Sequence, residues 1–210
     1  MSHGAAFDAA VRRCPLVAIL RGVRPDEVVS IGEAVLDAGF TLIEVPLNSP
    51  DPLDSIARLA QAFAGRAVVG AGTVLEEQEV DAVQAAGGTL VISPNASIDV
   101  IVRTARAGLV SLPGIATPSE AFAALRAGAT ALKLFPAEGA NPAVLKAMRA
   151  VLPSSVRVFP VGGITPDNLS GWLKAGAAGF GLGSALYTPG LTPEQVSIRA
   201  KKFVAALAAG

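Results

Sequence analysis

Eight short apolar runs recur along this chain of 210 residues, and stretches with helical spacing of apolar residues separate them. The runs begin about 20 to 26 residues apart, and each has the length of a buried strand. Strands that are covered on both faces read as nearly unbroken apolar runs, which is typical of parallel sheets. The predicted strands are Leu16–Arg21, Leu42–Leu47, Ala67–Thr73, Leu90–Pro94, Val110–Gly114, Ala131–Pro136, Val156–Val161 and Gly179–Gly183.

The stretches between the runs, such as Pro25–Ala38 and Pro52–Phe63, carry the start and stop signals of helices. Thr117–Glu120 combines a capping threonine, a proline in the first turn and an acid, and most of the stretches end at a glycine. Eight such strand–helix units predict one α/β domain over residues 1–210, a (β/α)₈ TIM barrel. A short N-terminal helix over Ala5–Arg12 is expected to cover the barrel floor. The alternative is a doubly wound open sheet.

Charge and composition exclude several classes of function. The 17 basic and 17 acidic side chains balance, so the chain has no electrostatic footprint for nucleic acid or an anionic membrane. No apolar run reaches the roughly 18 residues of a membrane span, and the N-terminus does not read as a signal peptide. We therefore expect a soluble, cytoplasmic protein with no nucleic-acid or membrane partner.

Cysteine and histidine each occur once, as Cys14 and His3. A single cysteine excludes an internal disulfide and a metal site built on cysteines. A single histidine near the N-terminus argues against a Ser-His-Asp triad and against a His-rich zinc site. The sequence therefore predicts no metal site, and acid–base chemistry that relies on carboxylates, lysine or water.

Lys133 is a charge in the middle of the apolar run Ala131–Pro136, where a buried strand should hold none. Alternation along the strand puts it on the inner face of the barrel. Burial penalises the charged amine and lowers its pKa, which favours the neutral, nucleophilic form of a Schiff-base lysine. The alternative is a lysine at a strand end that extends its amine into water.

Glu44 is a second charge inside an apolar run, Leu42–Leu47, and alternation also places it on the inner face. Its strand is the second and that of Lys133 the sixth, so the two stand opposite each other in a ring of eight. We expect the two side chains to approach each other directly or through one water. The alternative is a buried structural ion pair, although such pairs contribute little stability.

Three further residues follow predicted strands at the end where TIM barrels hold their active sites. Arg21 ends the first strand, and its guanidinium suits a carboxylate or a phosphate, unless it is a solvated loop arginine. Thr73 follows Gly70-Ala71-Gly72 and is a candidate carboxylate clamp or, alternatively, a helix N-cap. Pro94 ends the fourth strand and is a candidate for the pocket wall.

Glycine pairs follow the last two strands, at Gly162-Gly163 and at Gly181-Leu182-Gly183-Ser184. Glycine allows backbone N–H groups to approach an anion closely, and a phosphate between these two loops recurs in TIM barrels. Helix packing also favours small residues, so each pair alone is a weak signal. Together they predict a phosphorylated ligand.

Motifs in one order over nearly the whole chain resemble those of the class I aldolases that cleave 2-keto-3-deoxy-6-phospho sugar acids, the KDPG/KHG aldolase family. They are Ile43-Glu44-Val45, Gly70-Ala71-Gly72-Thr73, Ile92-Ser93-Pro94, Leu112-Pro113-Gly114, Lys133-Leu134-Phe135-Pro136-Ala137-Glu138, Gly162-Gly163-Ile164 and Gly183-Ser184. The resemblance implies a homotrimeric TIM barrel that needs no metal or cofactor. It also implies retro-aldol cleavage of a phosphorylated 2-keto-3-deoxy sugar acid to pyruvate and glyceraldehyde 3-phosphate.

The resemblance also implies roles for single residues. Lys133 would form the Schiff base, Glu44 would shuttle protons through water, and Thr73 would hold the carboxylate at the pyruvate end. Phe135 would form a wall of the pocket. The phosphate would bind at two turns, Gly162-Gly163 and Gly183-Ser184.

The family has a phosphogluconate and a phosphogalactonate branch, which differ at the C4 hydroxyl of the sugar. The first usually has arginine and threonine before the proline after strand 2, and threonine before the strand 7 glycines; this chain has Asn48, Ser49 and Val161 there. These residues favour the phosphogalactonate branch, and the missing arginine makes Arg21 the expected carboxylate partner. The alternatives are a phosphogluconate or 4-hydroxy-2-oxoglutarate aldolase and, more remotely, a non-catalytic phosphosugar-binding barrel.

Overall fold

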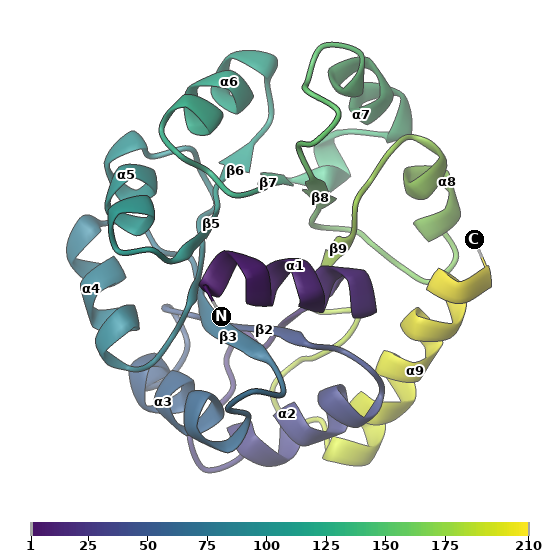
Figure 1. The fold of residues 1–210 in the computed structure, drawn as a ribbon. Helices are drawn as coiled ribbons and strands as arrows, with labels where there is room; N and C mark the ends of the chain where they lie inside the picture. The colour runs from purple at the N-terminus through teal and green to yellow at the C-terminus, as the bar shows by residue number, and fades with distance from the viewer. Residues whose placement is uncertain (1, 210) are drawn as a thin grey trace.

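Parallel strands form the centre of the structure, a computed structural model that describes residues 2–209 (Figure 1). The strands are β1 (Leu16–Ile19), β2 (Leu42–Pro46), β3 (Val68–Gly72), β4 (Leu90–Ile92), β5 (Val110–Leu112), β6 (Gly114–Ile115), β7 (Leu132–Leu134), β8 (Val158–Pro160) and β9 (Phe180–Leu182). Each predicted apolar run contains a strand, but most strands are shorter than their run. The last residues of several runs leave the sheet and belong to the loops that follow.

The strands form a curled six-stranded sheet in the order β5-β4-β3-β2-β1-β9 and a three-stranded sheet in the order β6-β7-β8. β1 therefore pairs with both its successor and the last strand, which a doubly wound sheet with a switch point would not show. A parallel bridge between Val161 and Gly181 joins the end of β8 to β9. On the other side only Pro113 separates β5 from β6. The fold is thus α/β, with parallel strands surrounded by helices.

Pro113 splits the fifth apolar run, Val110–Gly114, into two strands. Proline has no N–H group to donate to a neighbouring strand, so the ladder is interrupted at this residue. Its carbonyl still accepts a hydrogen bond from the Lys133 N–H group at 2.9 Å. The first half, β5, pairs with β4, and the second half, β6, pairs with β7.

Helices surround the strands, and α1 lies across them (Figure 1). They are α1 (His3–Arg13), α2 (Val28–Asp37), α3 (Pro52–Ala62), α4 (Glu77–Ala85), α5 (Ile98–Arg106), α6 (Pro118–Arg126), α7 (Pro142–Arg149), α8 (Leu169–Lys174) and α9 (Pro193–Ala209), with a short 3₁₀ turn, η1 (Ala137–Gly139), after β7. Among residues 2–209, no helix is long and apolar enough to cross a membrane.

The predicted start of a helix is confirmed at α6, whereas α2 begins later than predicted. Thr117 and Glu120 form a capping box, with each side chain accepting a hydrogen bond from the other residue's N–H group. The second helix begins at Val28 rather than at Pro25. A turn precedes it, in which the Glu27 carboxylate accepts a hydrogen bond from the Arg24 N–H group at 3.2 Å.

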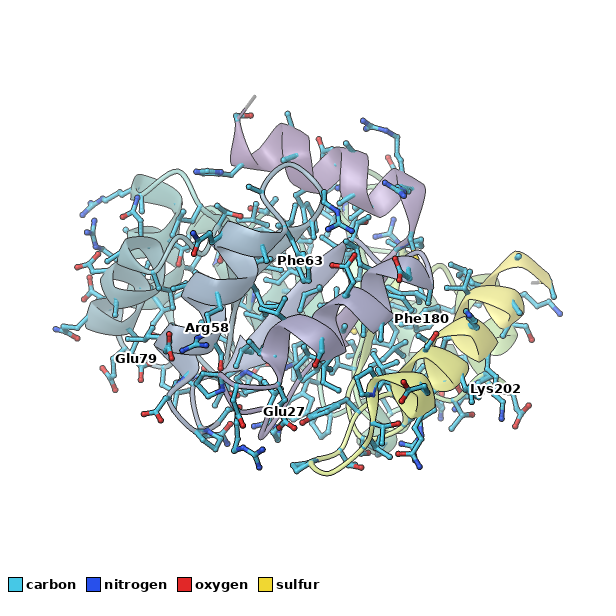
Figure 2. The ribbon with its side chains drawn as sticks, turned by 90° about the horizontal axis from the view of Figure 1, so that it is seen from below. Glu27, Arg58, Phe63, Glu79, Phe180 and Lys202 are labelled. Carbon is cyan, nitrogen blue, oxygen red and sulfur yellow. The ribbon has the colours of Figure 1, made fainter. Side chains whose placement is uncertain are left out.

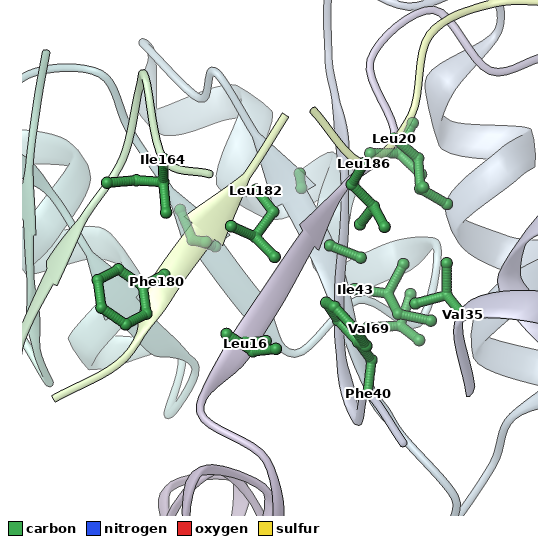
Figure 3. Close-up of a cluster of buried hydrophobic side chains, with 14 of the residues drawn as sticks. Leu16, Leu20, Val35, Phe40, Ile43, Val69, Ile164, Phe180, Leu182 and Leu186 are labelled. Carbon is green, nitrogen blue, oxygen red and sulfur yellow. The ribbon is translucent and has the colours of Figure 1, made fainter. Parts of the chain in front are cut away.

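The outward faces of the strands pack against the surrounding helices. Figure 3 shows Leu16 of β1 and Phe180 of β9 on this face, with Ile43 of β2 packed near Val35 of α2. Burying a side chain of this size stabilises the fold by about 1.5 to 3 kcal/mol. Because successive residues of a strand point to opposite faces, the alternate residues are left for the interior.

The inward faces of the strands form a second apolar cluster, which α1 covers at one end as predicted. Phe7 of α1 is fully buried, and its ring centroid lies 6.3 Å from that of Phe159 on β8. The strand residues of this cluster are Val17, Leu42, Val68, Leu90, Ile92, Val110, Leu112 and Phe159, and Ala131, just before β7, joins them. Figure 2 shows α1 at one end of the molecule and Glu27, just before α2, at the other. The carboxyl ends of the strands therefore lie away from α1.

Candidate active site

Lys133 lies in the centre of β7, and its side chain is 6% exposed. Its neighbours Leu132 and Leu134 join the outer cluster, so the lysine points inward as strand alternation predicts. Burial lowers the pKa of Lys133; the carboxylate of Glu44 opposes this shift, and the guanidinium of Arg21 adds to it. A lysine in this setting is more often neutral, and therefore nucleophilic, than a solvated one.

Phe135 lies beside the amine of Lys133. The Nζ atom is 4.4 Å from the centroid of the phenyl ring, within the range of a cation–π contact. The face of an aromatic ring attracts positive charge. The ring therefore favours a cation at this nitrogen, whether an ammonium or an iminium.

Glu44, in the middle of β2, is 1% exposed. Burial raises its pKa to about 7, and the nearby cations Lys133 and Arg21 reduce the shift. Its Oε2 atom is buried without a hydrogen-bond partner in the described residues. The carboxylate rests on the backbone of Gly72, where an added Cβ would lie 1.9 Å from Oε2. Only glycine at position 72 leaves room for it.

Glu44 and Lys133 both line a small cavity between the strands. Its volume is about 10 Å³, which is room for one water molecule. Within residues 2–209, no ion pair of 4.0 Å or less joins the two side chains. The structure thus places the two charges on one cavity, as opposite strands predict, but not as a closed salt bridge. Its other lining residues are Val17, Ile19, Ile92, Leu112, Phe159, Val161 and Gly181.

A larger pocket of about 410 Å³ opens from Lys133 towards the loops after β8 and β9. This volume suits a small-molecule ligand. The pocket gathers most of the predicted site residues into one place: Arg21, Lys133, Phe135, Val161, Gly162, Gly163, Gly183 and Ser184. Five other predicted residues, Glu44, Thr73, Pro94, Asn48 and Ser49, are not in its lining, and of these Glu44 lines the small cavity instead.

Arg21 is held at the edge of this pocket by residues of the loops after β2 and β3. Its Nη1 atom donates to Asn48 Oδ1 at 2.5 Å, and its Nη2 atom donates to Thr73 Oγ1 at 3.4 Å. Ser49 accepts a hydrogen bond from the Gly22 N–H group at 2.9 Å, which fixes the loop that carries Arg21. Asn48 and Ser49 therefore support Arg21 in this structure instead of facing the pocket.

Thr73 has a left-handed backbone, with φ of 58°, which is uncommon for a β-branched residue. The reading of Thr73 as a helix N-cap is wrong, because α4 is capped by Glu76 in a box with Glu79. Strained backbone of this kind concentrates at functional sites. Pro94, in contrast, packs its carbonyl against Gly114, where a Cβ would lie 2.2 Å from the oxygen.

Two polar residues of the pocket had been given no role from the sequence. Glu138 follows the Phe135-Pro136-Ala137 segment, and its carboxylate lies on the Gly162-Gly163 turn. Thr165 adds a hydroxyl to the same wall. Neither interrupts an apolar run, so neither gave the signal that revealed Glu44 and Lys133.

Comparison with known proteins agrees with this geometry. The family model described as KDPG and KHG aldolase matches residues 7–198. The 2-dehydro-3-deoxy-6-phosphogalactonate aldolase of Escherichia coli is 48% identical over 194 residues, which cover 92% of this chain and 95% of that protein. A probable enzyme of the same name from Rhizobium meliloti is 44% identical over 192 residues, covering 91% of each. The 2-dehydro-3-deoxy-phosphogluconate aldolase of Pseudomonas aeruginosa is 31% identical, covering 80% of this chain and 76% of that one.

Solved structures give the same result. The native KDPGal structure superposes with a TM-score of 0.92 at 48% identity, covering 93% of this chain and 95% of that one. The 2-keto-3-deoxy-6-phospho-gluconate aldolase of Zymomonas mobilis superposes with a TM-score of 0.82 at 30% identity, covering 93% and 94%. The family model and these relatives span most of the chain, and on this evidence the chain belongs to the KDPG and KHG aldolase family.

Proposed function

We propose that this chain is a metal-independent class I aldolase that cleaves 2-dehydro-3-deoxy-6-phospho-D-galactonate to pyruvate and D-glyceraldehyde 3-phosphate. The observation that carries the proposal is the desolvated Lys133, which faces Glu44 across a water-sized cavity and opens onto the larger pocket. The relatives named for this reaction, at 48% and 44% identity, support it.

In the proposed mechanism the neutral amine of Lys133 attacks the C2 carbonyl of the substrate. The adduct loses water to give an iminium, which accepts the electron pair of the C3–C4 bond as that bond breaks. The C4 hydroxyl loses its proton, and glyceraldehyde 3-phosphate leaves. The remaining enamine takes a proton at C3, and water then releases pyruvate and restores the lysine. The face of Phe135 stabilises the iminium cation.

Glu44 is proposed to carry the protons of these steps. A group with a pKa of about 7 gives and takes protons with equal ease near neutral pH. The cavity that it shares with Lys133 has room for about one water, which would suit a relay between the carboxyl group and the reacting atoms.

The two ends of the pocket suit the two anionic ends of the substrate. Arg21, supported by Asn48 and Thr73, is proposed to bind the carboxylate beside C2. The turns at Gly162-Gly163 and Gly183-Ser184 are proposed to bind the phosphate through backbone N–H groups. Gly183 has open space above it, since an added Cβ there would meet no atom within 4 Å.

Trapping the Schiff base tests the proposed chemistry. Incubation with pyruvate and borohydride is expected to add one reduced pyruvate to Lys133, which peptide mass spectrometry locates. Lys133→Ala is the control and should remain unmodified. An unmodified Lys133 in an enzyme that turns over substrate would overturn the proposal, as would activity that chelators abolish. Equal ligand binding by both forms without turnover would instead support the non-catalytic barrel.

The second candidate is a phosphogluconate or 4-hydroxy-2-oxoglutarate aldolase, and more distant relatives carry these activities in their names. Of the three predicted specificity residues, Val161 alone lines the pocket. Its apolar side chain cannot hydrogen-bond a C4 hydroxyl, whereas a threonine can. Cleavage rates on the two C4 epimers separate the candidates, and Val161→Thr is expected to shift the ratio towards the gluconate epimer.

We also propose that the strands close into a complete (β/α)₈ barrel. The pairing of β1 with β9 and the bridge between Val161 and Gly181 support closure on one side. The continuity of β5 and β6 through Pro113 supports it on the other. Backbone amide exchange should show slow exchange on all strands, whereas rapid exchange at one seam would indicate an open sheet.

A homotrimer is proposed as the working assembly. Three exposed apolar side chains, Leu53, Leu75 and Ile98, follow successive strands at the pocket end of the molecule. A relative at 48% identity, with a TM-score of 0.92, forms part of a cage designed from symmetric oligomeric domains; the match covers 93% of this chain and 73% of that one. Light scattering after size exclusion is expected to give three times the 21.1 kDa chain mass. Leu75→Asp should lower it.

A cytoplasmic location is proposed from the chemistry of the substrate. A phosphate ester that also carries a carboxylate is a multiply charged anion, which does not cross a lipid bilayer unaided. Cell fractionation with a soluble marker enzyme tests this location.

A further inference from the structure

Glu138 is an acidic residue in a pocket where an anion is expected to bind. It lies in the η1 turn directly after β7. The Ala137 N–H group donates to the Val161 carbonyl at 2.9 Å, which ties this turn to the end of β8. The backbone of the turn is therefore tied to the end of β8, while Glu138 is an exposed residue.

The carboxylate of Glu138 covers the glycine turn. A Cβ on Gly162 would lie 1.9 Å from its Oε2 atom, and a Cβ on Gly163 would lie 2.8 Å from its Cγ atom. Both glycines have positive φ, of 107° and 63°. Within residues 2–209 the carboxylate has no ion-pair partner and makes no side-chain hydrogen bond. It therefore rests on the turn without a strong contact that would hold it there.

Glu138 also stands between two open spaces. It lines the 410 Å³ pocket that contains Lys133, and it lines a neighbouring groove of about 550 Å³ towards α7 and α8. Gly162 and Gly163 border both spaces. A rotation of the Glu138 side chain would move its charge from the pocket side of the turn to the groove side.

We propose that Glu138 is a specificity-determining residue that competes with the phosphate group for the Gly162-Gly163 turn. This inference rests on the proposed function, which puts the phosphate at that turn. Two anions so close repel each other, so phosphate binding moves the Glu138 carboxylate into the groove. A ligand must form enough contacts, including those at Gly183-Ser184, to compensate for that repulsion.

The carboxylate of Glu138 also affects the direction in which the substrate binds. The substrate is anionic at both ends, and a pocket that attracted any anion at both ends would also bind it reversed. Arg21 attracts the carboxylate at one end of the pocket, while Glu138 repels a weakly bound anion at the other. Unfavourable contacts of this kind are a common source of binding specificity.

Inhibition by inorganic phosphate tests the proposal. In Glu138→Gln, which keeps the shape of the side chain and removes its charge, phosphate is expected to inhibit about threefold to tenfold more strongly than in wild type. The KM for the phosphorylated substrate should fall in parallel. The concentration of pyruvate that half-saturates borohydride trapping at Lys133 should not change, because that end of the pocket is untouched.

Asp167→Asn is the matched control, since it removes a negative charge from the same groove at a residue that lies outside the pocket lining. It is expected to keep the wild-type phosphate constant. An effect equal to that of Glu138→Gln would overturn the proposal, because a general change of charge would then explain both. Phosphate inhibition that is unchanged or weaker in Glu138→Gln would overturn it as well.

Glu138→Asp gives a second measurement if the glutamine variant does not fold. Its shorter side chain keeps the charge but withdraws it from the turn, so an intermediate gain in phosphate inhibition is expected, and no gain would contradict the proposal. Failure of the proposed function would look different. In that case wild-type protein would show neither turnover nor a pyruvate adduct, whereas failure of this inference leaves both intact.

Discussion

The two ends of the strand interior are made from the same strands but have opposite chemistry. At the amino ends, Phe7 of α1 packs on Phe159 and other apolar side chains, and this end contributes to the second apolar cluster. At the carboxyl ends, the buried charges of Glu44 and Lys133 share a small cavity. One end is built as a hydrophobic core, and the other holds groups that a core normally excludes.

The contrast indicates a division between stability and chemistry. Apolar burial at the α1 end stabilises the fold. At the other end the desolvated charges destabilise the fold, and the same desolvation shifts their pKa values. A substitution at the first end should therefore change stability without changing the reaction. A substitution at the second should do the reverse.

The largest expected effect follows from Lys133→Met. Methionine keeps much of the volume of lysine but has no amine, so cleavage should fall by about 10⁴-fold or more. Stability should change little, because loss of the desolvated amine offsets loss of its attraction to Glu44, whose raised pKa lets the remaining carboxyl group take up a proton. Steady-state kinetics and urea unfolding measure the two effects. A clear loss of stability in Lys133→Met would contradict the proposed division between stability and chemistry.

Glu44→Gln should lower kcat by about 10² to 10⁴-fold, the usual contribution of a general acid–base group. Glutamine has the shape of glutamate, but its amide cannot give up or take up a proton near neutral pH. Borohydride should still trap pyruvate on Lys133, only more slowly, which separates this variant from Lys133→Met. Wild-type kcat in Glu44→Gln would assign the proton transfers to another group.

Phe7→Ala tests the opposite end. Removing a fully buried phenylalanine leaves a cavity and should cost about 3 to 5 kcal/mol of unfolding free energy. The kcat measured at a temperature where the variant remains folded should stay within about twofold of wild type. A large fall in kcat with intact folding would mean that α1 also shapes the active site.

The pH dependence of stability provides a further test. The carboxyl group of Glu44 has a pKa near 4.5 when unfolded and about 7 when folded, so between these values the native state holds a proton that the unfolded state has released. Stability should therefore fall as pH rises from about 4.5 to about 7, by about 3 kcal/mol. Glu44→Gln should lack this decline. Urea midpoints of both proteins across that range measure the difference, and parallel curves would contradict the raised pKa.

The smallest effect is expected from Asn48→Ala. Loss of the hydrogen bond to Arg21 should loosen the guanidinium and weaken pyruvate binding by about threefold to tenfold. The ratio of cleavage rates on the two C4 epimers should not change, because Asn48 supports Arg21 rather than lining the pocket. A changed ratio of cleavage rates would show that Asn48 does determine substrate specificity.

The sequence predicts the repeating units well because buried parallel strands need apolar runs and helices need caps. It overestimates the strand ends at residues such as Arg21, Thr73 and Pro94. These residues come directly after the apolar runs but have left the hydrogen-bonded ladder, and hydrophobicity does not record where the ladder ends. The split at Pro113 was missed for the related reason that proline is as apolar as its neighbours.

For the site, the strongest signals in the sequence were charged residues inside apolar runs. Glu44 and Lys133 were placed correctly on the inner face because strand alternation is a local rule. Asn48 and Ser49 were assigned to the pocket from their place in the chain, although they contact the loop after β1. Glu138 ended one of the family motifs but was given no role, since an acid in a turn is ordinary and its position over Gly162 depends on three-dimensional contacts.

The pairing of β1 with β9 bears on how the chain folds during synthesis. Leu16 pairs with Phe180, so the partner of the first strand leaves the ribosome only near the end of translation. Until then one edge of β1 remains without its neighbour, and contacts between such distant segments form slowly. A truncated chain that ends before Phe180 should therefore expose the unpaired backbone N–H and C=O groups of β1 and aggregate. The assembly of this enzyme depends on its last strand reaching its first.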